Sequence, residues 1–269
     1  MMVAVLRWHT NPVRRGDWPP TDHSGGTNMV STRTTARIVG VLFIIGTVAG
    51  SLSAVLLTPI LGASDVLLTA AERSDRALLG VLLILVMGFA LALIPLVLFP
   101  ILKVYSEPLA LGYAVFRGGL ETATYLVSAL VWLILVGLGR EYVDAPTPEA
   151  SRLDAVGAVV LRVDDAVGHV LLPIVFPIGA LMFYYVLYGS RLVPRWLAGW
   201  GIAAAFLWIA AGLFAIFGIV TPYSMVQIAM ALPIAIQEMV LAVWLIVRGF
   251  DTARVASGAG ETGITPQQV

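Results

Sequence analysis

The chain has 269 residues, of which 59% are hydrophobic and 12% are charged, and its mean hydropathy is +0.93. A soluble domain carries about 25% charged residues, so this composition excludes an ordinary soluble globular protein and also intrinsic disorder. Cysteine is absent, and basic and acidic residues number 16 each, which excludes a disulfide scaffold and a nucleic-acid binder recognisable by bulk charge. The class that remains is a helical integral membrane protein.

Residues 1–35 precede the first apolar run and contain several Arg, Pro, Ser, Thr and Gly residues. Their composition predicts a disordered cytoplasmic tail without a secretory signal. Met29 is an alternative start, because residues 31–33 lead directly into the first apolar run. Residues 251–269 are predicted to form a second disordered cytoplasmic tail.

Six apolar segments between the tails are long enough to cross a membrane, which takes about 20 helical residues. The predicted spans are 38–57, 77–102, 109–138, 166–188, 196–220 and 225–247. The last two are separated by residues 221–224, Thr-Pro-Tyr-Ser, a cluster typical of a turn. Transmembrane barrels instead show segments of about 10 residues with alternating polarity, so strands are disfavoured. The predicted fold is therefore all-α, a polytopic six-transmembrane-helix bundle over residues 36–250.

The hydrophilic segments predict the orientation of this bundle. The face that carries the termini has 10 basic residues against 5 on the other face, so the positive-inside rule places both termini in the cytoplasm. The long outer segment, residues 139–165, is predicted to be a loop that contains a short amphipathic helix.

Ionisable side chains inside the spans are rare, and each is a candidate site because burying a charge in a membrane is costly. Arg117 and Glu121 lie four residues apart on one face of the third span, and Glu238 lies in the sixth. Glu238 and Glu121 have similar depths, roughly 15 Å from the cytoplasmic helix ends. We therefore expect Arg117 to pair with Glu121 and Glu238 in one buried cluster if the third and sixth spans are neighbours; otherwise Arg117 would extend to the membrane interface. Such a cluster could bind a proton or a substrate, or could only hold the helices in register. Gln237 and Gln227 are assigned to the same cluster, since Gln227 lies about three turns before Glu238 on nearly the same face.

A second, weaker polar group lies at the outer boundary, where Asp164 and Asp165 precede His169. These residues could bind a metal ion or sense pH, but a metal site usually needs three or four ligands. The pattern favours a hydrogen-bonded histidine at the boundary, and no metal is predicted.

Small residues in the first span form a Gly46-xxx-Gly50 motif, which allows close approach of two helices. The motif is interpreted as internal packing rather than as a dimerisation surface.

Catalytic motifs are not evident: the chain lacks cysteine, and the HExxH, GxSxG and Walker A patterns are absent. The segment Gly258-x-Gly260-x-x-Gly263 has the glycine spacing of a dinucleotide-binding motif. The match is attributed to chance, because no strand is predicted before it and too few residues follow it to form a helix. The sequence therefore predicts no enzyme and no cofactor.

Several segments resemble a bacterial family of multi-pass membrane proteins catalogued as domain of unknown function 4386. The resemblance extends from Thr34 to Phe250 and is carried by the segments 36–40, 98–103, 110–117 with Glu121, 188–196, 232–238 and 244–250. The N-terminal tail departs from the family pattern. The resemblance implies a bacterial cytoplasmic-membrane protein and no particular activity.

Two function classes stay open. A binding or transport protein, including a proton-coupled or small-solute transporter, would have a water-accessible pocket that reaches the Arg/Glu cluster. A structural or accessory protein would have a dry bundle and a helix face that contacts a partner. The lipid bilayer is the expected surrounding and nucleic acid is not expected, whereas a second membrane protein or a second copy of the chain stays open as a partner.

Overall fold

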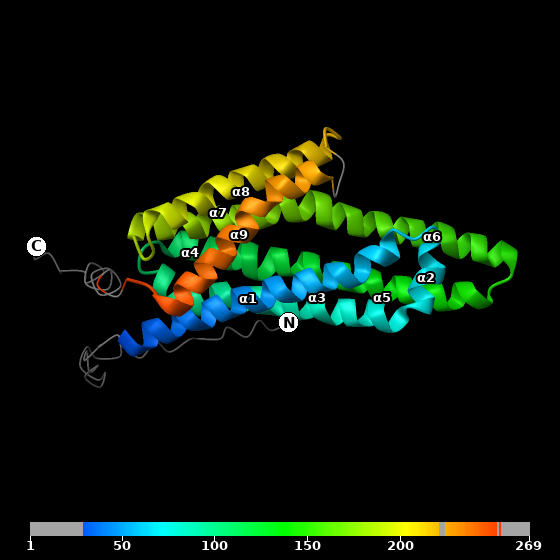
Figure 1. Cartoon of the computed structure of the whole chain (residues 1–269), viewed down its shortest axis with the longest axis horizontal. Coiled ribbons are helices and arrows are strands. Elements are labelled where there is room, and N and C mark those ends of the chain that lie inside the picture. Colours follow the sequence, from blue (N-terminus) through cyan, green and yellow to red (C-terminus); the bar gives the residue numbers. More distant parts are fainter. Residues whose placement is uncertain (1–28, 221–223, 252, 254–269) are drawn as a thin grey trace, which may run out of the picture.

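The computed structural model describes residues 29–220, 224–251 and 253, and the regular elements among these residues are all helices (Figure 1). Four membrane-length helices are continuous α-helices: α1 (Met29–Leu61), α3 (Ser74–Leu102), α8 (Arg195–Ile216) and α9 (Met225–Val247). The other two are longer and each contains a π-helical segment. The third crossing comprises α4 (Glu107–Tyr113), η1 (Ala114–Glu121) and α5 (Thr122–Asp144), and the fourth comprises α6 (Thr147–Ala166), η2 (Val167–Leu171) and α7 (Leu172–Ser190).

Within the described residues, six helices are long and apolar enough to cross a membrane. The protein is a multi-pass membrane protein, and the predicted all-α fold with six crossings is confirmed. Backbone groups in hydrocarbon must be satisfied internally, which explains why every long apolar segment is helical.

The helix ends differ from the expected span ends at two places. Helix α1 begins at Met29, so residues 29–35 are helical rather than part of a tail. This extension is physically reasonable because adding a residue to an existing helix is far easier than nucleating one. The remaining N-terminal tail, most of the C-terminal tail and residues 221–223 of the expected turn lie outside the described residues.

The expected outer loop, residues 139–165, is a helical hairpin instead. Helix α5 continues to Asp144, and the 20-residue α6 begins at Thr147 with a proline in its first turn, where the missing N–H has no consequence. The prediction of a loop with a short helix was wrong because hydropathy marks where a helix leaves the membrane, not where it ends. The hairpin extends to the right in Figure 1, beyond the ends of α8 and α9.

The short helix α2 (Val66–Glu72) fastens this hairpin to the bundle. Its N-terminus is capped by Asp65, whose carboxylate accepts a hydrogen bond from the Leu68 amide at 3.0 Å and another from the Tyr142 hydroxyl at 3.1 Å. Leu67 is buried and lies against two glycines, Gly139 of α5 and Gly157 of α6. The absence of side chains at both positions lets α2 contact the hairpin closely.

Helix α1 packs on α3 through the small-residue motif. A methyl group at Gly46 would meet the Leu91 side chain, and one at Gly50 would meet the sulfur of Met87. The interpretation of this motif as internal packing is confirmed. Helix α9 packs on α1 nearer the start of α1 and the end of α9, where Gly40 lies against the backbone of Ala242.

Two glycines of α5, two residues apart, provide a matched test of the α2 contact. A methyl group at Gly139 would collide with the backbone carbonyl of Leu67, whereas one at Gly137 would meet nothing within 4 Å. We expect Gly139→Ala to lower the free energy of unfolding by about 1–3 kcal/mol through overpacking. Gly137→Ala should be neutral or stabilise by up to about 1 kcal/mol through helix propensity. Thermal unfolding in detergent measures both, and equal unfolding temperatures for the two variants would contradict the described packing.

Candidate functional site

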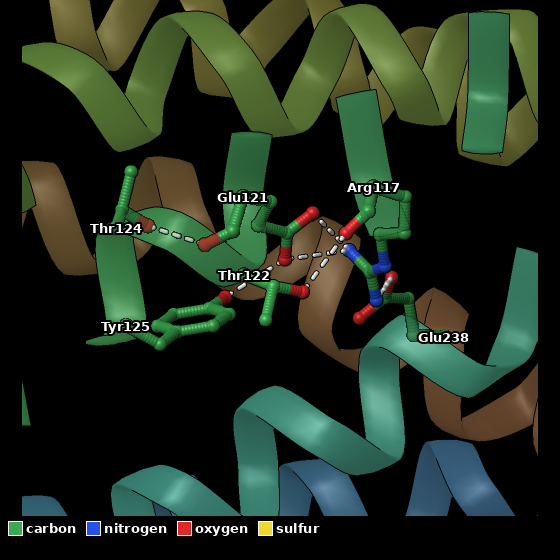
Figure 2. A network of polar contacts seen from close by, with 6 residues as sticks. All are labelled: Arg117, Glu121, Thr122, Thr124, Tyr125 and Glu238. Carbon is green, nitrogen blue, oxygen red and sulfur yellow. Dashed lines mark hydrogen bonds and ion pairs between the residues drawn. The ribbon is translucent and has the colours of Figure 1, made fainter. Parts of the chain in front are cut away.

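The guanidinium group of Arg117 lies between two carboxylates (Figure 2). Its Nη1 is 3.1 Å from Glu121 Oε1 and 3.2 Å from Glu121 Oε2. Its Nη2 donates to Glu238 Oε1 at 3.1 Å. Arg117 is 2% exposed and Glu121 is 0% exposed, whereas the Glu238 side chain is 14% exposed. The structure therefore brings these three predicted residues together, with Glu238 the most accessible of them.

The ion pair between Arg117 and Glu238 connects two helices that pack on different neighbours. Segment η1, which carries Arg117, packs on α3 and α7, whereas α9, which carries Glu238, packs on α1 and α8. Two long side chains therefore connect the third and sixth crossings across the interior. Removal of Arg117 would leave Glu238 without its counter-ion, whereas removal of Glu238 would leave Arg117 paired with Glu121 alone.

The helix that carries Arg117 and Glu121 is π-helical at this point, as η1 spans both residues. The Thr122 hydroxyl donates to the Arg117 carbonyl at 3.4 Å, and the Thr124 hydroxyl donates to the Glu121 carbonyl at 2.7 Å. These side chains supply partners to backbone carbonyls where the hydrogen-bond pattern is altered. Short π-helical segments occur frequently at functional sites.

Aromatic rings contact the cluster. The carbon at the centre of the Arg117 guanidinium lies 5.7 Å from the ring centre of Phe43 and 4.9 Å from that of Phe176. The Tyr125 hydroxyl donates to Glu121 Oε1 at 2.8 Å. Cation–π contacts of this kind stabilise a desolvated guanidinium by about 2 kcal/mol.

The cluster is not fully satisfied by its neighbours. Among the described residues, the buried Nε of Arg117 has no hydrogen-bond partner, and neither has the indole Nε1 of the nearby Trp208. Only one cation faces two carboxylates, so with all three groups ionised the cluster carries a net charge of −1.

A cavity of about 330 Å³ adjoins the cluster, and all six membrane crossings contribute to its lining. Its lining includes the polar residues Arg117, Glu121, Glu238 and Tyr125 as well as the aromatic residues Phe176 and Trp208. The arrangement can hold a small ligand that contacts both charged groups and aromatic rings.

The two glutamines assigned to the cluster lie elsewhere. Gln237 is fully buried, accepts a hydrogen bond from the Tyr184 hydroxyl at 2.6 Å and donates to the Leu197 carbonyl at 3.1 Å, so it links α9 to α7 and α8. Gln227 lines a separate cavity of about 300 Å³ together with His169. Three helical turns separate Gln227 from Glu238 by about 16 Å, and a shared helix face therefore does not bring the two into contact.

The predicted outer-boundary group does not converge on one point. Asp164 accepts a hydrogen bond from the Ser128 hydroxyl at 2.6 Å and thereby links α6 to α5. His169 Nδ1 lies 3.2 Å from the Asp165 carbonyl and 3.9 Å from its carboxylate. In the described part of the chain, no group of three His, Asp or Glu side chains is arranged to hold a metal ion.

Sequence reasoning missed the aromatic residues Phe43, Phe176 and Trp208. Phenylalanines in apolar spans carry no signal that distinguishes a site from a core. Trp208 did carry such a signal. Tryptophan in membrane helices is enriched at the interfaces, whereas Trp208 lies thirteen positions after the start of α8.

A family model described as Domain of unknown function (DUF4386) matches residues 38–249. The chain belongs to this family. The match covers the helices from α1 to α9 and includes Arg117, Glu121 and Glu238. The resemblance identified from sequence segments is confirmed. No curated protein and no solved structure matches the chain.

The charge arrangement predicts unequal effects of neutralising its members. Arg117→Met leaves two buried carboxylates without a cation and should lower the free energy of unfolding by about 3–5 kcal/mol. Glu238→Gln should have a smaller effect, because Glu121 still neutralises Arg117. The triple variant Arg117→Met/Glu121→Gln/Glu238→Gln should recover much of the loss. Thermal unfolding in detergent measures this series, and strictly additive effects would show that the three groups are not coupled.

Proposed function

We propose that the protein is a non-enzymatic solute-binding protein of the membrane whose site takes a small organic cation with an apolar body. The observation that carries this proposal is the cavity that reaches Glu238 and Arg117. A bundle in which the cluster only held the helices in register would be closed at this point.

The sign of the ligand charge follows from the cluster. Two carboxylates and one guanidinium leave one negative charge in a medium of low dielectric constant, where an uncompensated charge is strongly unfavourable. Among the described residues, the second carboxylate oxygen of Glu238 accepts no hydrogen bond. A cationic ligand that contacts this oxygen compensates the charge.

The shape and lining of the cavity match the rest of such a ligand. Rings of Tyr125, Phe176 and Trp208 line it, and aromatic faces attract ammonium groups through cation–π interactions. Its volume of about 330 Å³ is at the lower end of the range for small-molecule sites, about 300–1,000 Å³.

Transport of the same cation in exchange for a proton is a second candidate. Leu172 and Trp208 line both the central cavity and the cavity near His169, so these two side chains separate the cluster from a hollow closer to the outer end. A proton on one carboxylate would neutralise the empty site. The family resemblance assigns this exchange to the bacterial plasma membrane, and the positive-inside rule assigns both termini to the cytoplasm.

Cation binding can be tested with benzyltrimethylammonium, which has a fixed positive charge and an aromatic body. We expect calorimetric titration of the purified protein in detergent to detect binding, and Glu238→Gln to weaken it at least tenfold, about 1.4 kcal/mol. Glu107→Gln is the matched control, because Glu107 is exposed at the start of α4 outside the cavity.

The same titration with benzoate separates charge recognition from simple apolar partitioning. Benzoate should not bind, because its charge has the sign of Glu238. Equal heats for the cation and the anion, or equal affinity of wild type and Glu238→Gln, would overturn the cation site.

Proton exchange has its own measurement. If a bound cation replaces a proton, adding benzyltrimethylammonium to weakly buffered protein should release up to one proton per binding site, detected with a pH indicator dye. Glu238→Gln should abolish this release. Cation binding without proton release would reject the exchange and leave the binding site standing.

A further inference from the structure

Two hollows adjoin each other at the end of the bundle where α1 begins and α9 ends. One is a cleft of about 530 Å³ between the α7–α8 turn and the end of α9, and the other is a groove of about 650 Å³ along α9. Trp244 and Arg248 line both of them. The two hollows therefore form one continuous surface feature.

The cleft is strongly basic. Arg191, Arg195 and Arg248 line it, and all three are exposed. Within the described part of the chain, none of them forms an ion pair with a carboxylate. The one acidic residue in the lining is Asp251, whose Oδ1 accepts a hydrogen bond from the Ala253 amide at 3.1 Å.

A single backbone contact brings these arginines together from separate parts of the chain. The Asp251 amide donates to the Leu192 carbonyl at 3.0 Å, which joins the segment after α9 to the α7–α8 turn. Both segments turn sharply through left-handed residues, Arg191 with φ of 57° and Gly249 with φ of 74°. The three arginines thus line one preformed cleft.

The groove has the opposite character and is almost entirely apolar. Its lining consists mainly of one face of α9 with Thr47 of α1, and includes Ile236, Val240, Val243 and Val247. From Ile236 to Val247 the helix rises about 17 Å, close to the thickness of one leaflet of hydrocarbon, about 15 Å. The groove therefore has the length of an acyl chain that starts at the level of the arginines.

We propose that this feature is a binding site for an anionic phospholipid. The phosphate lies among Arg191, Arg195 and Arg248, and one acyl chain lies along α9. Basic pockets between helices on the cytoplasmic side of membrane proteins bind such headgroups, and arginine matches the geometry of phosphate. Aromatic residues at the same level support this depth: Trp196 and Trp244 lie edge to face at 6.5 Å, and Arg195 lies over the ring of Tyr188 at 5.2 Å. The site is independent of the proposed cation site.

The test compares phosphatidylglycerol and phosphatidylcholine with identical acyl chains, added to the full chain in detergent and measured by native mass spectrometry. We expect phosphatidylglycerol to bind more tightly. Each single variant, Arg191→Gln, Arg195→Gln or Arg248→Gln, should weaken it about fivefold, the usual contribution of a basic side chain at an anionic surface. The triple variant should abolish the preference over phosphatidylcholine.

The control is the triple variant Arg140→Gln/Arg152→Gln/Arg162→Gln, which removes three exposed arginines from the α5–α6 hairpin at the other end. It should leave the preference unchanged. Because the single variants alter exposed side chains, they keep the test decisive if the triple variant in the cleft fails to fold. Equal binding of the two lipids, or an equal loss in the control, would overturn the proposal.

A further arm separates a lipid from a free phosphate ester. Glycerol 3-phosphate is used as the probe without acyl chains, and Val240→Trp/Val243→Trp fills the groove without changing the arginines. We expect glycerol 3-phosphate to compete poorly and the filled groove to weaken lipid binding at least tenfold. Full competition by glycerol 3-phosphate, with no effect of the filled groove, would show an anion site and reject the lipid.

Discussion

The pairing of Arg117 with two carboxylates constrains the centre of this bundle. A guanidinium in hydrocarbon requires counter-charges and hydrogen bonds, and here they come from its own helix and from α9. The π-helical segment, the threonine hydroxyls and the two phenylalanine rings are all arranged around that one group. Because η1 packs on α3 and α7 whereas α9 packs on α1 and α8, the ion pair between Arg117 and Glu238 also fixes the position of α9 relative to η1.

The same pairing is unbalanced in a way that a structural role does not require. One carboxylate would suffice to neutralise Arg117, and a second one adds desolvation cost. The more exposed of the two, Glu238, lies beside the cavity, and the buried Nε of Arg117 has no partner among the described residues. Excess charge, an unsatisfied donor and a cavity therefore coincide at one place, and this coincidence is what supports the proposed cation site.

The sequence was sufficient to locate this site because the helical rise per residue gives the depth of each side chain in the membrane. Counting helical rise from the helix ends placed Glu121 and Glu238 at similar depths, and the structure brings both to Arg117. Helical periodicity alone did not suffice: Gln227 shares a face with Glu238 but lies in another cavity, and Gln237 is adjacent in sequence but bonds to Tyr184. The basic cleft could not be predicted, because it depends on a backbone contact between Asp251 and Leu192. The α5–α6 hairpin was missed because charged residues end an apolar run without ending a helix.

Helix α9 connects the two sites physically. Thr47 and Ala235 line both the lipid-facing groove and the central cavity, so about one turn of α9 separates the acyl-chain surface from Glu238. An organic cation with an apolar body partitions into the membrane and concentrates where the lipid headgroups are anionic. For the proposed cation, Thr47 and Ala235 are therefore the side chains that lie between the groove and the cavity beside the cluster. Nearer the start of α1 and the end of α9 the two helices are in close contact, because Gly40 lies against the backbone of Ala242.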